Sequence, residues 1–328
     1  MVPLLALTLV ITQISALEPG DSTRTITVGD LERSYLVHVP KSYDGSKPVP
    51  VVLVFHGGGS NAGQWVRFCG LNETADKAGF IAVYPNGTGK KIEGYPEDVL
   101  TWNGGRRQPG GNDALLQKVD DVSFTRELLD DLAKVAKVDA QRVYATGMSM
   151  GAIMTYRLAS ELSDRIAAIA PVCGPMGTET CRPKRPVSVI HFHGTEDEAV
   201  PLKGGKGKLD VSGTDFYSVD HSIRAWVKAN GCHEKPTTDE LPDRVDDGTK
   251  VIRKTYSGGE DGSQVVLVVI EGGGHTWPGR EFGPELKVLG KSTKDVAANA
   301  LIWEFFENHP MKPSTTQRAS KQPTTNLP

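Results

Sequence analysis

The chain has 328 residues, of which 38% are hydrophobic and 23% charged, with a formal net charge of −3 at pH 7. This length is enough for one large α/β domain or two small ones, and the composition is typical of a soluble packed core. The near-neutral charge and the lack of a Lys/Arg cluster argue against nucleic acid or an anionic membrane as a partner.

The chain begins with a short apolar segment. Residues 2–14 are mostly apolar, which is too short for a bilayer span of about 20 residues but long enough for the core of a signal peptide. Ser15 and Ala16 supply small residues for cleavage before Leu17. We therefore expect residues 1–16 to be a signal peptide and the protein to be secreted or periplasmic, with no membrane span in the mature chain. The alternatives are a retained membrane anchor and a buried first strand.

Hydrophobic patterns along the body of the chain predict strands that alternate with helices. Residues 49–55, VPVVLVF, are apolar and β-branched, as in a central parallel strand buried on both faces. The predicted strands are 25–28, 35–39, 49–55, 80–84, 142–146, 166–172, 187–191 and 265–270, and the predicted helices are 62–78, 122–136, 152–162, 217–229 and 294–307. This alternation indicates an α/β fold, with a mostly parallel central sheet and helices on both faces.

Two further segments depart from this alternation. The Gly/Pro/Asn-rich stretch from 85 to 113 is longer than most loops of compact domains, and such loops are often functional. The last residues, 310–328, are polar and contain no aromatic side chain, so we expect a disordered tail after a catalytic domain of residues 17–309.

The segment Gly147–Gly151, GMSMG, fits the G-x-S-x-G pattern between a predicted strand and a predicted helix. That pattern is typical of a sharp turn that exposes a nucleophilic Ser149 hydroxyl at the top of a sheet. Three glycines follow His56 at the end of the central strand. In the α/β-hydrolase fold, which G-x-S-x-G indicates, this position supplies one backbone donor for an oxyanion. The predicted donors are Gly58 and Met150, with Gly57 as an alternative to Gly58. We expect His56 to hold this loop rather than to react.

Two later residues complete a predicted triad. Asp197 follows a late strand in HGTEDEAVP, where an acid can orient a histidine, and its neighbours Glu196 and Glu198 are the competing carboxylates. His275 lies among glycines after the strand VVLVVI and is the predicted general base. The chain order Ser, Asp, His is the order of the α/β-hydrolase fold.

Several other side chains have competing interpretations. His191 and His193 share one face of a strand, but no third ligand has suitable spacing, so we expect a hydrogen-bonded pair and no metal site. Trp102 and Trp277 are candidate walls of the substrate site, and a buried loop anchor is an equal alternative for Trp102. No cofactor is expected.

The four cysteines form an even set, which an exported protein can use for disulfides. Four cysteines allow three connectivities, between which sequence does not choose. Because Cys173 and Cys181 bracket the turn-rich GPMGTET, we expect a local disulfide between them, which leaves Cys69 and Cys232 as the remaining partners.

With these segments in place, the chain resembles the bacterial extracellular esterase family that includes polyhydroxybutyrate depolymerases and feruloyl esterases. The matching segments run in the family's order over roughly residues 30 to 309: FHGGGSNAGQW, GFIAVYPNGTG, TWNGG, VDDVSF, DAQRVYATGMSMGA, HFHGTEDEAVP and GGGHTWPG. The resemblance implies an ester hydrolase with Ser149 as nucleophile, Asp197 as acid and His275 as base. It also implies that TWNGG and GGGHTWPG lie near the active-site mouth.

The expected function is therefore that of a secreted serine carboxylic-ester hydrolase that acts through an acyl-enzyme. Its substrate would be a small or oligomeric ester, with polyesters and plant cell-wall esters as candidates, and the polar tail favours soluble esters over a solid polymer. Two alternatives remain: a secreted serine peptidase of the same fold, and a non-catalytic binding protein that has kept the fold. Such peptidases usually carry a domain that gates substrate access, and the sequence has no room for one.

Overall fold

The computed structural model describes residues 16–90, 99–105, 118–210 and 213–312. The predicted signal peptide therefore lies outside the described residues except for its last residue, and so does the predicted tail beyond residue 312. Within the described ranges, no helix has both the length and the apolar character needed to cross a membrane.

A ten-stranded sheet forms the centre of the molecule, with the strand order β1-β2-β4-β3-β7-β8-β9-β14-β13-β12. The six middle strands, from β4 to β14, are parallel, and two antiparallel strands extend the sheet at each edge. The strands are β1 (Gly20–Val28), β2 (Leu31–Val39), β3 (Val49–Phe55), β4 (Ile81–Pro85), β7 (Val138–Met148), β8 (Ala168–Val172), β9 (Ser188–Gly194), β12 (Thr237–Glu240), β13 (Lys250–Tyr256) and β14 (Val265–Glu271). Two short pairs lie apart from this sheet, namely β5 (Thr88–Lys90) with β6 (Val99–Thr101) and β10 (Gly205–Lys206) with β11 (Asp215–Phe216).

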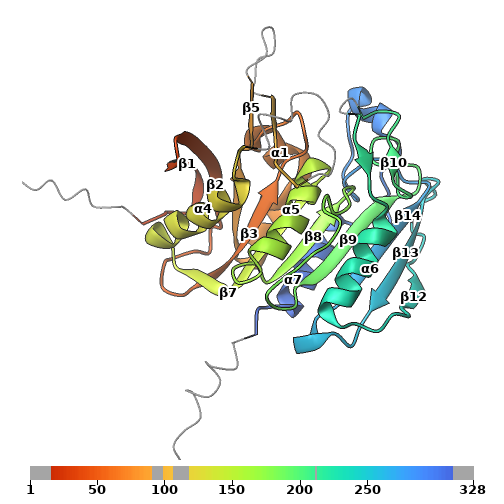
Figure 1. Ribbon diagram of the computed structural model, residues 1–328. Coiled ribbons are helices and arrows are strands. Elements are labelled where there is room, and N and C mark those ends of the chain that lie inside the picture. The colour runs from red at the N-terminus through yellow and green to blue at the C-terminus, as the bar shows by residue number, and fades with distance from the viewer. Residues whose placement is uncertain (1–15, 91–98, 106–117, 211–212, 313–328) are drawn as a thin grey trace, which may run out of the picture.

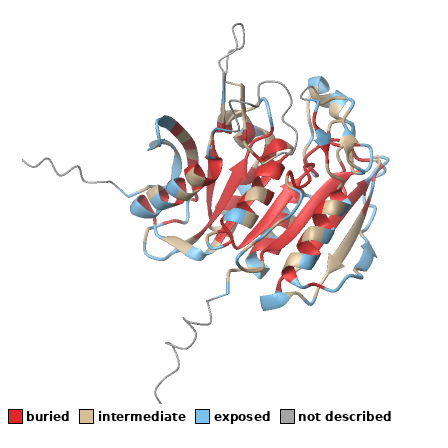
Figure 2. Cartoon of the chain, in the orientation of Figure 1, coloured by how far each residue is buried: buried red, intermediate tan, exposed pale blue. Residues whose placement is uncertain are grey.

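Helices cover both faces of the sheet (Figure 1). One layer holds α4 (Asp121–Val135), α5 (Met150–Glu161) and α6 (Val219–Asn230), and the other holds α1 (Ala62–Cys69), α2 (Leu71–Ala78) and α7 (Ala298–Asn308). Short 3₁₀ helices lie at η1 (Glu260–Gly262) and η2 (Pro284–Leu289). Successive residues of β3 enter opposite layers: Leu53 packs with the first and Val54 with the second. The central strands are therefore buried on both faces (Figure 2), as the predicted doubly covered parallel sheet requires.

One predicted helix and two strands at one side of the sheet differ from the sequence prediction. The predicted helix at 62–78 is divided at Gly70, whose left-handed φ of 62° caps α1 through an N–H bond to the carbonyl of Val66. Glycine adopts this conformation without the steric cost that a Cβ brings, so α1 ends there and α2 starts in a new direction. Strands β12 and β13 are absent from the prediction. The sequence of β12, TTDE, is polar and exposed, and β13 has a single buried residue, Val251, so neither shows an apolar face.

The predicted Cys173–Cys181 disulfide is wrong, because all four cysteines are free thiols. Cys173 is buried in the core layer of α7, whereas Cys181 packs against the opposite layer. The sheet thus separates two residues that are close in sequence, and a disulfide needs Cβ atoms that approach to about 4 Å. The remaining pair is also divided, with Cys69 in the layer of α7 and Cys232 in the layer of α4, α5 and α6.

Helix α5 packs directly against the backbone of the central strand β3, and glycine makes this contact possible. A Cβ atom on Gly151 would lie 2.2 Å from the carbonyl oxygen of Phe55 and 2.7 Å from that of His56. A Cβ on Gly147, at the end of β7, would lie 2.6 Å from the same Phe55 oxygen. Backbone atoms cannot yield as a flexible side chain can, so both positions require glycine.

We predict that Gly151→Ala lowers the free energy of unfolding by about 3 kcal/mol or more, because the new methyl group overpacks backbone atoms. Gly63→Ala is the matched control in α1, since its nearest neighbour would be Asn61 Oδ1 at 3.5 Å. The control should leave stability unchanged or raise it by up to about 1 kcal/mol. Urea unfolding of both variants measures the difference, and similar changes in the two would contradict the close-contact account.

Candidate active site

Five neighbouring parallel strands end at the same edge of the sheet, and the residues after them carry the predicted chemistry. In sheet order, the ends of β3, β7, β8, β9 and β14 lead to Gly57–Gly59, Ser149, Cys173, Asp197 and His275. In open parallel sheets, the carboxyl ends of the strands are where ligand-binding loops gather. The predicted triad residues therefore come from strands that lie close together in the sheet.

Ser149 forms the turn between β7 and α5. Its backbone has φ 57° and ψ −120°, a conformation that is costly for a residue with a side chain. The turn is held on both sides: the N–H of Ser149 donates to the carbonyl of Val172 at 2.9 Å, and its own carbonyl accepts from the N–H of Ile153 at 3.0 Å. Ser149 is only partly buried, so the strained turn presents the residue at the edge of the sheet, as the G-x-S-x-G pattern predicts.

The glycine loop after β3 lies beside this turn. A Cβ on Gly57 would lie 3.7 Å from the Cβ of Ser149, and a Cβ on Gly58 would lie 3.0 Å from Met150 Cγ. Met150 is the first residue of α5, and the first N–H groups of a helix have no partner within the helix. The structure thus brings the two predicted oxyanion donors, Gly58 and Met150, next to the predicted nucleophile.

His56 holds the glycine loop from within the core. Its Nδ1 donates to the carbonyl of Gly57 at 2.8 Å and its Nε2 accepts from the N–H of Gly87 at 3.0 Å. This pair of bonds fits a neutral ring with its proton on Nδ1. Burial lowers the pKa of His56 to about 4, with a smaller contribution in the same direction from the positive charge of Arg33. The contacts of this histidine therefore agree with the structural role expected for it.

Asp197 and His275 form a buried hydrogen-bonded pair. Asp197 Oδ2 accepts from His275 Nδ1 at 2.8 Å, while Oδ1 accepts from the N–H groups of Ala199 and Val200 at 3.0 and 2.7 Å. Burial acts to raise the pKa of Asp197, but His275, His193 and the backbone donor together hold it below its ordinary value. The carboxylate therefore stays ionised and can orient the imidazole so that Nε2 is free to act as a base.

The loop that carries His275 is fixed to the end of η2 and to the residues that follow it. The N–H of His275 donates to the carbonyl of Leu289 at 2.6 Å, and the N–H of Gly274 donates to the carbonyl of Lys291 at 2.9 Å. These backbone bonds join the loop to a second segment of the chain. The histidine is thus positioned both through its ring and through its main chain.

The two tryptophans predicted as substrate walls lie in the interior. Trp102 is 1% exposed and donates through Nε1 to the carbonyl of His56 at 2.9 Å. Trp277 is fully buried and donates through Nε1 to Asn299 Oδ1 of α7 at 2.8 Å. Neither ring offers surface to a substrate in this structure. Trp102 instead supports the glycine loop and Trp277 ties the His275 loop to the core, so the substrate-wall assignment is replaced by an anchoring role.

His191 and His193 are the hydrogen-bonded pair that the sequence predicts. Tyr156 Oη lies 2.9 Å from His191 Nδ1, His191 Nε2 lies 3.1 Å from His193 Nδ1, and His193 Nε2 lies 2.7 Å from the carbonyl of Val200. Burial lowers the pKa of both histidines. This neutral chain of hydrogen bonds ends on the same short loop that donates to Asp197, and so it supports the position of the acid.

Cys173 also belongs to this site, although the sequence predicted it to form a disulfide with Cys181. Its Sγ lies 3.5 Å from the carbonyl oxygen of Thr276 and 3.9 Å from that of Gly274, the two residues that flank His275. The next residue, Gly174, packs against the serine turn, since a Cβ there would lie 2.4 Å from the carbonyl oxygen of Ser149. The end of β8 therefore contacts both the serine turn and the histidine loop. A cysteine placed directly after a strand is the only sequence signal of this position.

Comparisons with known proteins agree with this fold. The family model for esterases of the PHB depolymerase type matches residues 33–198. NocK, a predicted esterase of Nocardia uniformis subsp. tsuyamanensis, is 32% identical over 86% of this chain and 82% of its own length. Feruloyl esterase B of Piromyces equi is 30% identical over 74% of this chain but only 42% of its own length, so the chain spans less than half of that relative.

Solved structures show the same fold at low sequence identity. An acetyl xylan esterase from Aspergillus awamori superposes with a TM-score of 0.50 at 17% identity, over 78% of this chain and 94% of its own. The native crystal structure of pOPH superposes with a TM-score of 0.55 at 15% identity, over 93% and 91% of the two chains. At such identities, the likeness establishes the fold alone.

The sheet order, the strained serine turn and the two helical layers define an α/β-hydrolase, and the related esterases make it a carboxylic ester hydrolase. Within that class, the chain belongs to the PHB depolymerase esterase family.

The buried neutral state of His56 predicts a pH dependence of stability. An unfolded histidine takes up a proton near the ordinary histidine pKa of 6.5, whereas the pKa of folded His56 is about 4. The neutral state of His56 therefore costs no stability above pH 6.5, and the free energy of unfolding decreases as the pH falls from 6.5 toward 4. Over that range the loss amounts to about 3 kcal/mol, at ~1.4 kcal/mol per pKa unit.

Urea unfolding between pH 7 and 4 tests this expectation against His56→Gln, whose side-chain oxygen can still accept from Gly87. The wild type should lose more stability than the variant across that range, because the glutamine does not titrate. Parallel losses in the two proteins would show that His56 is not held neutral.

Proposed function

We propose that the protein hydrolyses carboxylic esters through an acyl-enzyme formed on Ser149. The observation that carries this proposal is the position of a strained, partly exposed serine on one strand end, with a buried Asp197–His275 pair on two nearby strand ends. A positioned base and a backbone donor pair beside a serine are the requirements for acyl transfer.

The proposed reaction has two halves. His275 Nε2 accepts the proton of Ser149 as its Oγ attacks the ester carbonyl, and the N–H groups of Gly58 and Met150 stabilise the resulting oxyanion. The C–O bond to the alcohol then breaks, and the alcohol leaves with the proton from His275. A water molecule attacks the acyl-enzyme in the same way, which releases the acid and restores Ser149. Asp197 keeps the imidazole oriented and stabilises its charged form in both halves.

We propose soluble short-chain or aromatic esters as the substrates and an extracellular or periplasmic location. The similarity to a feruloyl esterase and to the PHB depolymerase type supports the first part, and the predicted signal peptide supports the second. Val288 of η2 is 63% exposed and precedes Leu289, whose carbonyl accepts from His275. This apolar side chain near the histidine loop supports contact with an apolar part of the ester.

Ser149→Ala should abolish hydrolysis, with kcat lower by about 10³-fold or more, because triad members act as a unit. The assay uses purified protein on feruloyl, acetyl and 3-hydroxybutyryl esters, with a matched amide to test for peptidase activity. Circular dichroism and the unfolding midpoint serve as controls for the fold, which should persist. A variant that retains activity within about tenfold of the wild type would refute Ser149 as the nucleophile.

A further inference from the structure

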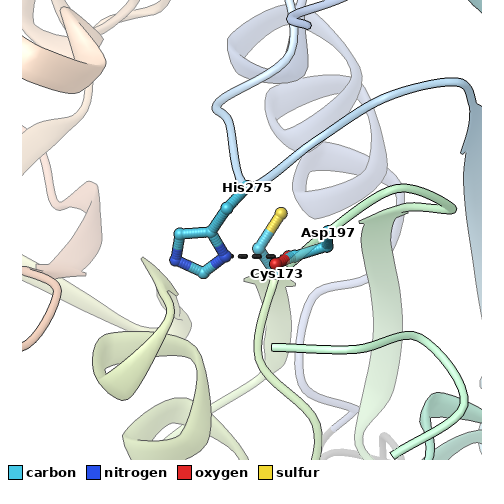
Figure 3. A group of neighbouring side chains, drawn as sticks. All are labelled: Cys173, Asp197 and His275. Atoms are coloured by element: carbon cyan, nitrogen blue, oxygen red, sulfur yellow. Dashed lines mark hydrogen bonds and ion pairs between the residues drawn. The ribbon is translucent and has the colours of Figure 1, made fainter. Parts of the chain in front are cut away.

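A thiol, a carboxylate and an imidazole converge at the centre of the site. The ligand atoms of Cys173, Asp197 and His275 all lie within 4.8 Å of one another (Figure 3). Among the residues that the structure describes, no other group of three histidine, cysteine or acidic side chains converges in this way. The acyl-transfer mechanism uses Asp197 and His275 but leaves the thiol without a chemical role.

The fold holds the thiol in this position. Cys173 has φ 51° and is one of three non-glycine residues with a left-handed backbone in the described part of the chain, together with Ser149 and Asp261. A glycine would adopt this conformation at lower cost. The side chain is directed at the carbonyls of Gly274 and Thr276, on either side of His275. The sulfur therefore occupies a fixed place beside the Asp197–His275 pair.

This ligand set suits one class of metal ion. Sulfur, imidazole nitrogen and carboxylate oxygen are the ligands of zinc, and three protein ligands leave one coordination position open. Thiolate sulfur favours ions of the zinc class over Mg²⁺ and Ca²⁺. The thiolate and the carboxylate would together balance the two positive charges of such an ion. The three residues are 2%, 4% and 6% exposed, so the ion would bind with little competition from solvent.

We propose that Cys173, Asp197 and His275 form an inhibitory site for a thiophilic divalent cation of the zinc class. The ion would bind Cys173 Sγ, a carboxylate oxygen of Asp197 and His275 Nδ1. The thiol proton is released to solvent, and the proton of the imidazole moves from Nδ1 to Nε2, so one proton leaves for each ion bound. An imidazole protonated on Nε2 cannot accept the proton of Ser149. The inhibition rests on the proposed role of His275 as base, whereas binding of the ion does not.

Binding is tested first in a protein that has no acyl-transfer chemistry. Ser149→Ala keeps all three ligands, and we expect it to bind one Cd²⁺ or Zn²⁺ per chain by calorimetry, with a cadmium–thiolate absorption band in the ultraviolet. Adding Cys173→Ser should remove the band and weaken binding by about 100-fold or more, beyond what loss of a supporting contact causes. Cys181→Ser is the matched control, because Cys181 packs against the opposite face of the sheet.

Inhibition is tested in the enzyme with Ser149 intact. Zn²⁺ should suppress ester hydrolysis by the wild type and by Cys181→Ser, and a chelator should restore it. Cys173→Ser, measured against its own metal-free rate, should need about 100-fold more Zn²⁺. Three outcomes would each overturn the proposal. They are failure of Ser149→Ala to bind the ion, equal effects of Cys173→Ser and Cys181→Ser, and binding of the ion without inhibition. A metal-free wild type without esterase activity would instead show that the proposed function has failed.

Discussion

The close approach of helix α5 to strand β3 is the constraint on which the rest of the site depends. It exists because Gly147 and Gly151 leave no Cβ between the helix and the carbonyl oxygen of Phe55. That contact forces the chain to turn sharply between β7 and α5, and Ser149 takes the strained φ of 57° at the turn. The same approach brings the start of α5 beside the glycine loop after β3. One packing contact thus sets both the exposure of the serine and the meeting of the two proposed oxyanion donors.

Buried polar groups fix the other half of the site. Asp197 accepts three hydrogen bonds, and His191 and His193 form a chain that ends on the carbonyl of Val200 in the same loop. A buried carboxylate is costly unless it is paired and hydrogen-bonded, and here every interaction that stabilises its charge also orients it. The neutral histidines add hydrogen bonds without adding charge. Asp197 is therefore held rigidly as well as ionised. Both properties are needed if it is to orient His275 as a general base.

Much of the fold could be predicted from sequence because its signals are local. Apolar β-branched runs such as Val49–Phe55 mark strands buried on both faces, and Gly147–Gly151 marks the turn between strand and helix. The division of one predicted helix at Gly70 has a local signal too, namely the glycine itself. A glycine within a helical pattern can either be tolerated or end the helix, so the sequence does not decide between the two. Strand β12 has an exposed polar sequence that becomes a strand only through pairing with β13.

What could not be predicted depends on which face of the sheet a residue occupies. Cys173 and Cys181 are eight positions apart, yet they pack on opposite sides of the sheet, and no local pattern reveals this. For the same reason, the position of a tryptophan beside a catalytic motif does not show whether its ring faces a substrate or the core. Trp277 follows His275 closely in sequence and is nevertheless fully buried against α7. Closeness in sequence to a catalytic motif thus indicates which residues lie near the site, but not the direction in which each side chain points.

The central claim is that Ser149 is a nucleophile activated by His275, and covalent trapping measures this most directly. A fluorophosphonate ester should add one phosphonyl group per chain, and peptide mass spectrometry should place it on Ser149. Labelling should be slowed by about 10³-fold or more in His275→Ala, because the base and the nucleophile act as a unit. Rapid labelling of a residue other than Ser149, or equal labelling rates with and without His275, would contradict the account.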